Sequence, residues 1–189
     1  SSPIAGLIIY NISTASLENY NGTSWVSLST GFVPYSGATG PVNLGAYNLT
    51  LQSMTIGLGG GNLATNTVMG KDALLANTTG TSNSAYGFNA LSSNMGGIAN
   101  TAIGYRTLFS NTGGVSNTAL GVEALYTNVN GSYNVATGRE ALYSNNYGSG
   151  NTANGYQALK LGVGGSNNTA TGYQALYNCE SYGNTANGY

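Results

Sequence analysis

The chain has 189 residues, which is enough for one ordinary domain or a pair of small ones. Its four basic and five acidic residues give a net charge of −1 and are spread thinly along the sequence. Binding to nucleic acid through phosphate neutralisation needs clustered Lys and Arg, so we expect no nucleic-acid partner.

Residues 1–30 are predicted to form a small β-strand and hairpin unit. Residues 6–10 are strand-like, and residues 17–20 are expected to pair back onto them. Asn21-Gly22 is a strong signal for a two-residue hairpin turn, after which residues 23–28 supply a third strand. Three such short strands cannot make a stable core alone, so we expect their apolar faces to contact other copies of the chain or a preceding domain.

Residues 31–61 are predicted to connect this unit to the remainder of the chain. Pro34, Pro41 and several glycines mark residues 31–48 as a connector. Residues 49–56 are expected to form one strand that enters the next domain, and residues 57–61 form a flexible or tightly turned junction.

Residues 62–189 contain a sequence motif that recurs every 17 residues. Its first position is always Asn, at Asn66, Asn83, Asn100, Asn117, Asn134, Asn151 and Asn168, and the last return, Asn184, comes after 16 residues. A fixed period indicates stacked structural units rather than a single globular core. Because the chain begins without Met and stops within a repeat, we expect it to be cut from a longer polypeptide in which the repeats continue.

Positions within the repeat are counted here from this Asn. Position 5 is always Gly, at Gly70, Gly87, Gly104, Gly121, Gly138, Gly155 and Gly172. Position 9 is always Leu, at Leu74, Leu91, Leu108, Leu125, Leu142, Leu159 and Leu176. Positions 3 and 8 are small, so each repeat offers one large and two small inward side chains. The Gly column predicts a backbone that has positive φ or that closely approaches its neighbour.

The repeats predict an all-β fold, a parallel β-solenoid or β-roll of 17-residue coils. Two-helix repeats need about 33 residues or more, and Gly, Asn, Thr and Ser are poor interior helix residues. At ~3.3 Å per residue a coil has a perimeter of at most ~56 Å, which suits a flattened or triangular turn with two or three short strands. The alternative is one helical turn per repeat. A narrow coil buries little apolar area, so we expect a homotrimer around a shared three-fold axis.

Asn at position 1, and often at position 12, is predicted to form ladders at the corners of the coil. The residues at position 12 are Asn77, Asn94, Asn111, Asn128 and Asn145. Stacked Asn side chains can hydrogen-bond along the axis, and Asn tolerates the left-handed conformation expected at corners. The alternatives are a metal ligand or a glycan acceptor, because glycosylation sequons begin at Asn11, Asn21, Asn48, Asn77, Asn130 and Asn167.

Aromatic residues recur directly after the Gly of position 5 and the Leu of position 9. If both columns face outward, they form stripes along the rod, in which the rings either stack on one another or contact a cell-surface glycan. The residues of this candidate site are Tyr105, Tyr126, Tyr143, Tyr156, Tyr173 and Tyr177.

Three segments resemble parts of known fibres. Residues 32–45 (FVPYSGATGPVNLG) resemble a segment widespread in bacteriophage tail-fibre proteins. Residues 8–11 (IIYN) with residues 20–26 (YNGTSWV) resemble a short β motif of phage fibres and bacterial surface proteins. The repeats, NTAxGxxAL, are similar to the head repeats of trimeric autotransporter adhesins but longer. The resemblance implies a trimer of left-handed parallel β-rolls, located outside the cell as a virion tail fibre or a cell-surface appendage.

The sequence offers little catalytic chemistry. It has no histidine, which removes the usual general base and the commonest metal ligand. Its single cysteine, Cys179, can form no intrachain disulfide and is expected to be buried in the stack. The longest apolar run, residues 4–10, is too short to cross a bilayer, so membrane insertion is not expected. We assign no catalytic residue, metal or cofactor.

Three functions are considered. The leading one is the trimeric shaft of a phage tail fibre that supports attachment to host-surface glycans, and the second is a bacterial adhesin or self-assembling surface filament. The third, a carbohydrate-active enzyme, rests on Glu123 and Glu140, which occupy position 7 of successive repeats. Stacking would place them roughly 5 Å apart, a spacing compatible with retaining glycoside hydrolysis. The simpler interpretation is two solvated carboxylates with Arg106 and Arg139 nearby, and we do not expect an enzyme.

Overall fold

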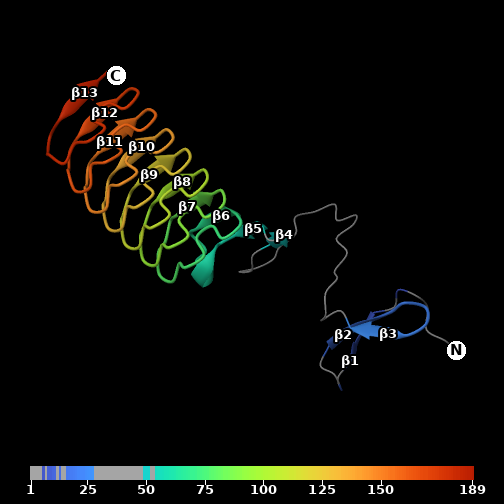
Figure 1. Ribbon diagram of the computed structural model, residues 1–189. Coiled ribbons are helices and arrows are strands. Elements are labelled where there is room, and N and C mark those ends of the chain that lie inside the picture. Colours follow the sequence, from blue (N-terminus) through green and yellow to red (C-terminus); the bar gives the residue numbers. More distant parts are fainter. Residues whose placement is uncertain (1–5, 7, 12, 14–15, 28–48, 52–53) are drawn as a thin grey trace. The chain divides into compact units, whose positions relative to one another are not determined.

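The computed structural model describes residues 6, 8–11, 13, 16–27, 49–51 and 54–189 (Figure 1). The predicted connector over residues 31–48 lies outside the described residues. The chain divides into two compact units, residues 1–43 and residues 44–189, and each is described by itself. The described part is all-β and contains no α-helix, so the alternative of a helical turn in every repeat is wrong.

The first unit holds a three-stranded antiparallel sheet in the order β1-β2-β3. Its strands are β1 (Ile8–Asn11), β2 (Ser16–Tyr20) and β3 (Trp25–Ser27). The rings of Tyr20 and Trp25 lie across from each other at the end of β2 and β3, with centroids 5.3 Å apart.

The turn between β2 and β3 differs from the prediction. Because Tyr20 pairs with Trp25, the turn has four residues, and the two-residue turn at Asn21-Gly22 is wrong. The Asn21 side chain accounts for the longer turn, since its Oδ1 accepts hydrogen bonds from the backbone N–H groups of Thr23 and Ser24, both at 2.9 Å.

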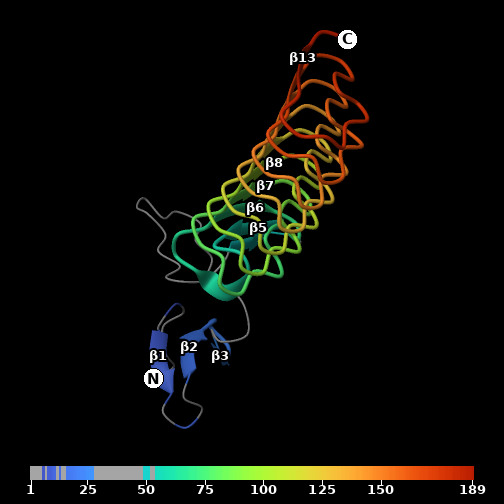
Figure 2. The same ribbon diagram turned by 90° about the vertical axis from the view of Figure 1, so that its left-hand side faces the viewer.

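The second unit is a parallel β-solenoid in which each coil is one of the repeats (Figures 1 and 2). Every repeat contributes one short strand, and these strands pair in parallel in chain order. They are β6 (Thr67–Gly70), β7 (Ser84–Tyr86), β8 (Thr101–Ile103), β9 (Thr118–Leu120), β10 (Val135–Thr137), β11 (Thr152–Asn154), β12 (Thr169–Thr171) and β13 (Thr185–Asn187). The register advances by one repeat per step, so Ala102 pairs with Ala85 on one side and Ala119 on the other. Equivalent residues therefore lie one above another.

An antiparallel strand pair precedes the first coil. β4 (Leu49–Leu51) pairs with β5 (Met54–Gly57), and β5 pairs antiparallel with β6. The structure thus has two strands where one was predicted over residues 49–56. The 3-10 helix η2 (Gly60–Asn62) then lies against the first coil, where the N–H of Gly60 donates to the carbonyl of Leu74 at 2.9 Å.

Each coil has a single strand, not the two or three predicted. The residues at positions 7, 9 and 17 have positive φ, for example 56° at Glu123, 51° at Leu125 and 60° at Tyr133. Such left-handed residues reverse the chain direction locally and end any extended run. The coils remain bonded on these sides, because the N–H of Leu125 donates to the carbonyl of Ala141 at 2.9 Å.

The core is one narrow column of side chains from positions 3, 8 and 9. Position 9 supplies the largest of these, and Leu91, Leu108 and Leu125 have no exposed surface. These Leu residues come directly after the inward residue of position 8. Their left-handed backbone conformation directs the Leu side chain into the same interior. The prediction of one large and two small inward residues per coil is therefore confirmed.

The Gly column lies where successive coils approach each other most closely. Gly121 has a φ of 132°, and a Cβ at this position would lie 2.7 Å from the carbonyl oxygen of Gly138 in the next coil. Real Cβ atoms do not come this close to backbone, so any other residue would push the coils apart. Both properties predicted for this column, positive φ and close approach, are present together.

The Asn residues of position 1 form the predicted hydrogen-bonded ladder. The Oδ1 of Asn117 accepts hydrogen bonds from the backbone N–H and the Nδ2 of Asn134, at 3.0 and 3.1 Å. Its Nδ2 donates to Asn100 Oδ1 at 3.1 Å and to the carbonyl of Gly131 at 2.8 Å. The ladder therefore links successive coils and also ties the start of each strand to the Gly at position 15 of its own coil.

A second ladder runs along position 12. Asn128 Nδ2 donates to Asn111 Oδ1 at 2.8 Å and to the carbonyl of Gly131 at 2.9 Å. The ladder residues of both columns are buried and have negative φ, so the expectation that they adopt the left-handed conformation is wrong. Their role is to satisfy backbone groups in the interior, where an unpaired polar group is costly.

The last coil is one residue shorter than the others, yet its ladder is intact. Asn168 Nδ2 donates to the carbonyl of Ser181 at 2.8 Å, where other coils use the Gly of position 15. The N–H of Asn184 still donates to Asn168 Oδ1 at 2.8 Å. The missing residue lies in the loop before Ser181, because Ser181 and Asn184 keep the three-residue spacing of Gly165 and Asn168.

Candidate functional site

The side chains of positions 6, 7 and 10 form the most chemically varied surface of the solenoid, here called the aromatic-charged face. They follow each strand in the turn where positions 8 and 9 point inward. Most of the charged residues of the repeats belong to this face, namely Lys71, Asp72, Arg106, Glu123, Arg139, Glu140 and Lys160. The solenoid strands β6–β13 carry no charged residue.

The aromatic rings on this face stack from coil to coil. At position 10, Phe109, Tyr126 and Tyr143 have centroid separations of 5.3 and 5.0 Å. At position 6, Tyr156 and Tyr173 lie 5.1 Å apart with an interplanar angle of 18°. Rings that stack in this way cover one another's faces, so their edges and phenol hydroxyls are left toward solvent.

Cations lie over aromatic rings of this face. Lys160 takes the place of a ring at position 10, with its Nζ 5.7 Å from the centroid of Tyr143 and 6.0 Å from that of Tyr177. Arg106 lies 5.3 Å from the Tyr105 centroid and 5.6 Å from that of Phe109. A cation over a ring face is attractive, so Lys160 continues the position 10 stack electrostatically, whereas Arg106 joins the position 6 and position 10 rings of its own coil.

The six candidate tyrosines form two stacked pairs and two tyrosines without a tyrosine neighbour, rather than continuous stripes along both columns. Tyr126 is stacked with Tyr143, and Tyr156 with Tyr173. Tyr105 stacks on Phe88, with centroids 5.7 Å apart. Tyr177 faces a lysine instead of a ring. The separation at position 6 arises because the two repeats between Tyr105 and Tyr156 carry Val and Arg there.

Glu140, which is buried, is the centre of a polar cluster that reaches the surface at Arg139. Its carboxylate accepts hydrogen bonds from Lys160 Nζ at 2.6 Å, Gln157 Nε2 at 2.8 Å and Arg139 Nε at 3.1 Å. Gln174 Nε2 donates to Gln157 Oε1 at 2.7 Å, which extends the cluster along position 7. The sequence analysis included Arg139 but not Lys160. The available signal was a lysine at position 10, where the coils before and after it carry tyrosine, one repeat after a glutamate.

The electrostatics of Glu140 oppose a role as a general acid. The hydrogen bond from Lys160 holds the pKa of this carboxyl below its ordinary value, with further lowering by Gln157 and Arg139, while burial opposes the shift. The same hydrogen bond raises the pKa of Lys160. Retaining glycosidases need one carboxylic acid whose pKa is raised. Glu123 has only a long contact with Arg106 Nη1, at 4.0 Å.

Burial is the largest cause that raises the pKa of one phenol on this face, that of Tyr143, and the charge of Glu123 adds to the effect. The phenol of Tyr143 therefore remains protonated above its ordinary titration range. It offers an O–H donor at the surface rather than a phenolate.

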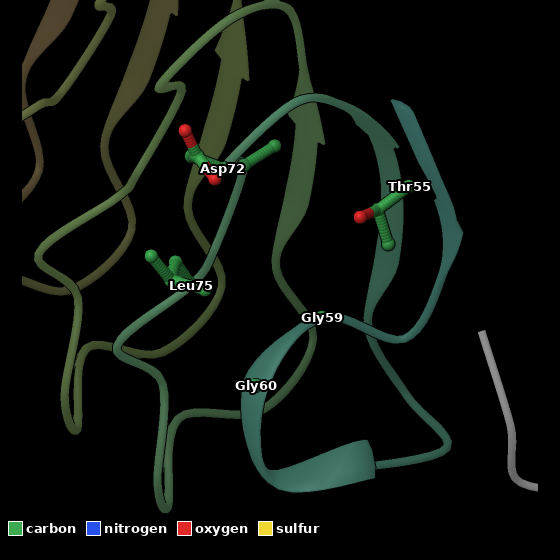
Figure 3. Close-up of a pocket in the computed structure, with 6 residues that line it drawn as sticks. Thr55, Gly59, Gly60, Asp72 and Leu75 are labelled. Carbon is green, nitrogen blue, oxygen red and sulfur yellow. The ribbon is translucent and has the colours of Figure 1, made fainter. Parts of the chain in front are cut away.

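A small pocket opens at the first coil (Figure 3). Its volume is about 150 Å³, and it is lined by Thr55, Gly59, Gly60, Asp72, Ala73 and Leu75. Ligand pockets are typically ~300–1,000 Å³. With one carboxylate, one hydroxyl and no basic group, this hollow is a packing gap between β5 and the turn after β6.

The described residues contain no group of three or more His, Cys, Asp or Glu placed to hold a metal ion. In the same part of the chain no helix has the length and apolar character needed to cross a membrane. Of the predicted sequons, that of Asn77 is buried within a ladder, whereas Asn21, Asn130 and Asn167 are exposed. Cys179 is partly buried against the core, where its Sγ lies 3.3 Å from Asn184 Nδ2.

Comparison of the chain with family models, curated proteins and solved structures gave no match. Any functional assignment therefore depends on the architecture and on the surfaces described above.

Proposed function

We propose that this chain is a structural segment of an extracellular fibre, namely the shaft of a bacteriophage tail fibre that supports attachment to host-surface glycans. The observation that carries the proposal is the equivalence of the coils. Every coil places a Leu of position 9 in or against the core and joins its neighbour through the Asn ladder of position 1, so the construction extends in one direction only. Such an architecture suits a shaft that holds an attachment site at a distance from the particle. The resemblance of residues 32–45 to tail-fibre segments adds the phage context.

The proposal includes a homotrimer in which the outer faces of the strands β6–β13 meet. Parallel sheets are normally covered on both faces, and only one face of this sheet lies on the core. The other face has no charged residue and exposes Met69, Ile103 and Leu120, at 44%, 41% and 46% of their surfaces. Interface centres are depleted of charge in the same way. The three-stranded sheet of residues 8–27 is proposed to be a separate hairpin unit of the same fibre.

A matched pair of variants tests the trimer. Leu120→Lys places a charge on the outer strand face and should lower the mass measured by light scattering from trimer to monomer. Val163→Lys makes the same change at position 13, away from the strands, and should leave the mass unchanged. A monomeric parent chain, or equal masses for both variants, would contradict the proposed packing.

The fibre role is tested by immunogold electron microscopy with antibodies against the chain. Labelling is expected along thin fibres attached to phage tails. Labelling of the surface of uninfected bacteria would instead identify the adhesin or filament alternative. Glycan attachment is tested separately, by binding of the assembled fibre to host cells before and after enzymatic removal of surface glycans, and unchanged binding would refute it.

A further inference from the structure

The stacked tyrosines are placed for a covalent reaction with one another. Tyr126 and Tyr143 belong to successive coils, and their ring centroids lie 5.0 Å apart with an interplanar angle of 10°. Tyr156 and Tyr173 lie 5.1 Å apart, and Tyr173 and Tyr189 lie 5.2 Å apart. Side chains of adjacent coils are held at this spacing by the strand register, so each ring has a permanent neighbour.

We infer that these pairs, Tyr126–Tyr143 and Tyr156–Tyr173 or Tyr173–Tyr189, are sites of oxidative cross-linking that join successive coils through dityrosine. The oxidant is hydrogen peroxide, used by a haem peroxidase that removes single electrons from phenols. The inference depends on the ring geometry alone and is independent of the proposed fibre role.

The reaction balances as follows. Each of the two phenols loses one electron and its hydroxyl proton to become a tyrosyl radical. The radicals form a carbon–carbon bond between the ring carbons next to the oxygens, and the hydrogens on those carbons move to the oxygens to restore both phenols. Two electrons and two protons reduce one peroxide to two waters, so every bond removes two hydrogen atoms from the protein.

Access and neighbours determine which rings react. Tyr156 and Tyr173 are exposed, and Tyr126 and Tyr143 are half-buried, so the phenol edges can be oxidised from solvent. Tyr105 stacks on Phe88, which has no phenol to oxidise. The solenoid therefore contains its own negative control within the same kind of stack.

Tyr177 provides a second internal control. Lys160 lies between it and Tyr143, so Tyr177 has a cation where the paired tyrosines have a phenol. The pattern of rings at positions 6 and 10 thus predicts which tyrosines couple and which remain single.

The test is oxidation of the dilute full chain with horseradish peroxidase and limiting hydrogen peroxide, followed by trypsin digestion and mass spectrometry. Cleavage after Arg106, Arg139 and Lys160 places Tyr126 and Tyr143, and likewise Tyr156 and Tyr173, on different peptides. Tyr173 and Tyr189 share residues 161–189, so their link appears as a loss of two hydrogens within that one peptide. The expected products join residues 107–139 to residues 140–160, and residues 140–160 to residues 161–189, each with two hydrogens lost per link. The protein should keep its unoxidised oligomeric mass and acquire dityrosine fluorescence.

Two variants keep the stacks but remove the reaction. Tyr143→Phe should abolish the link between residues 107–139 and 140–160 and leave the other, and Tyr173→Phe should do the reverse. Phe already occupies these columns at Phe88 and Phe109, so neither change disturbs folding, which circular dichroism verifies. The inference is overturned if no intrachain link forms, if the link persists in its variant, or if Tyr105 or Tyr177 couples as readily as the stacked pairs.

Discussion

Replacement of one ladder residue should show how much the buried Asn column contributes to stability. In Asn117→Ala, the backbone N–H of Asn134 loses its side-chain acceptor in the interior. An unpaired buried donor costs about 1–3 kcal/mol, and loss of the two hydrogen bonds donated by Asn117 Nδ2 adds about 1 kcal/mol each. The expected destabilisation is about 4 kcal/mol, a large fraction of the stability of an ordinary domain.

The assay is urea unfolding followed by far-ultraviolet circular dichroism, with Asn130→Ala as the matched control. Asn130 is an exposed Asn of the same coil, and its removal should change stability by less than about 0.5 kcal/mol. Hydrogen exchange adds a local measure, since the amide of Asn134 should exchange faster in Asn117→Ala while that of Asn151 stays protected. Equal unfolding midpoints for the two variants, with unchanged exchange at Asn134, would refute the reasoning.

Two further changes probe the Gly column and the buried carboxylate. Gly121→Ala should lower stability by more than about 1 kcal/mol, because Gly121 has a φ of 132° and the added Cβ would meet Gly138. Gly164→Ala is the matched control, because a Cβ there has open space, and it should be nearly neutral. Similar urea midpoints for the two variants would contradict the close approach of the coils. Because Lys160 lowers the pKa of Glu140 below 4.5, the stability from this pair is complete above pH 4.5 and is lost as pH falls through the lowered pKa. Glu140→Gln should therefore lose less stability than the parent between neutral pH and about pH 3, and equal losses would show that the carboxylate is not responsible.

The solenoid could be predicted from the sequence because the 17-residue period appears in the core, in the Gly column and in the Asn ladder. Only a stack of equivalent coils places Leu108 and Leu125 in the same environment, and only close approach of coils requires glycine at Gly121. The Asn ladder could be predicted for the same reason. An Asn that recurs at a fixed interval among apolar residues needs a hydrogen-bond partner, and the equivalent Asn of the next coil provides one.

The shape of one coil could not be predicted in the same way. Periodicity reports which residues are equivalent, whereas the path between them depends on backbone dihedrals that side chains specify weakly. Leu125 and Glu123 adopt left-handed φ although neither is a residue that favours it, because packing of the inward Leu and coil-to-coil hydrogen bonds outweigh the local cost.

The cluster around Glu140 was partly hidden for a related reason. Its partners come from three columns of the repeat and from two coils, so their proximity depends on how positions 6, 7 and 10 project from the turn. The stacking of the tyrosines was easier to predict, because each ring meets the equivalent ring of the next coil.

The shortened last coil has a consequence for how such a rod can be remodelled. One residue is absent before Asn184, and the neighbouring backbone closes the gap while the strand pairing of β12 with β13 keeps its register. That loop therefore tolerates a change in length, whereas the adjacent parallel strands do not. Peptide tags, epitopes or entire small domains could be inserted in this loop, one in each coil, without altering the spacing between coils.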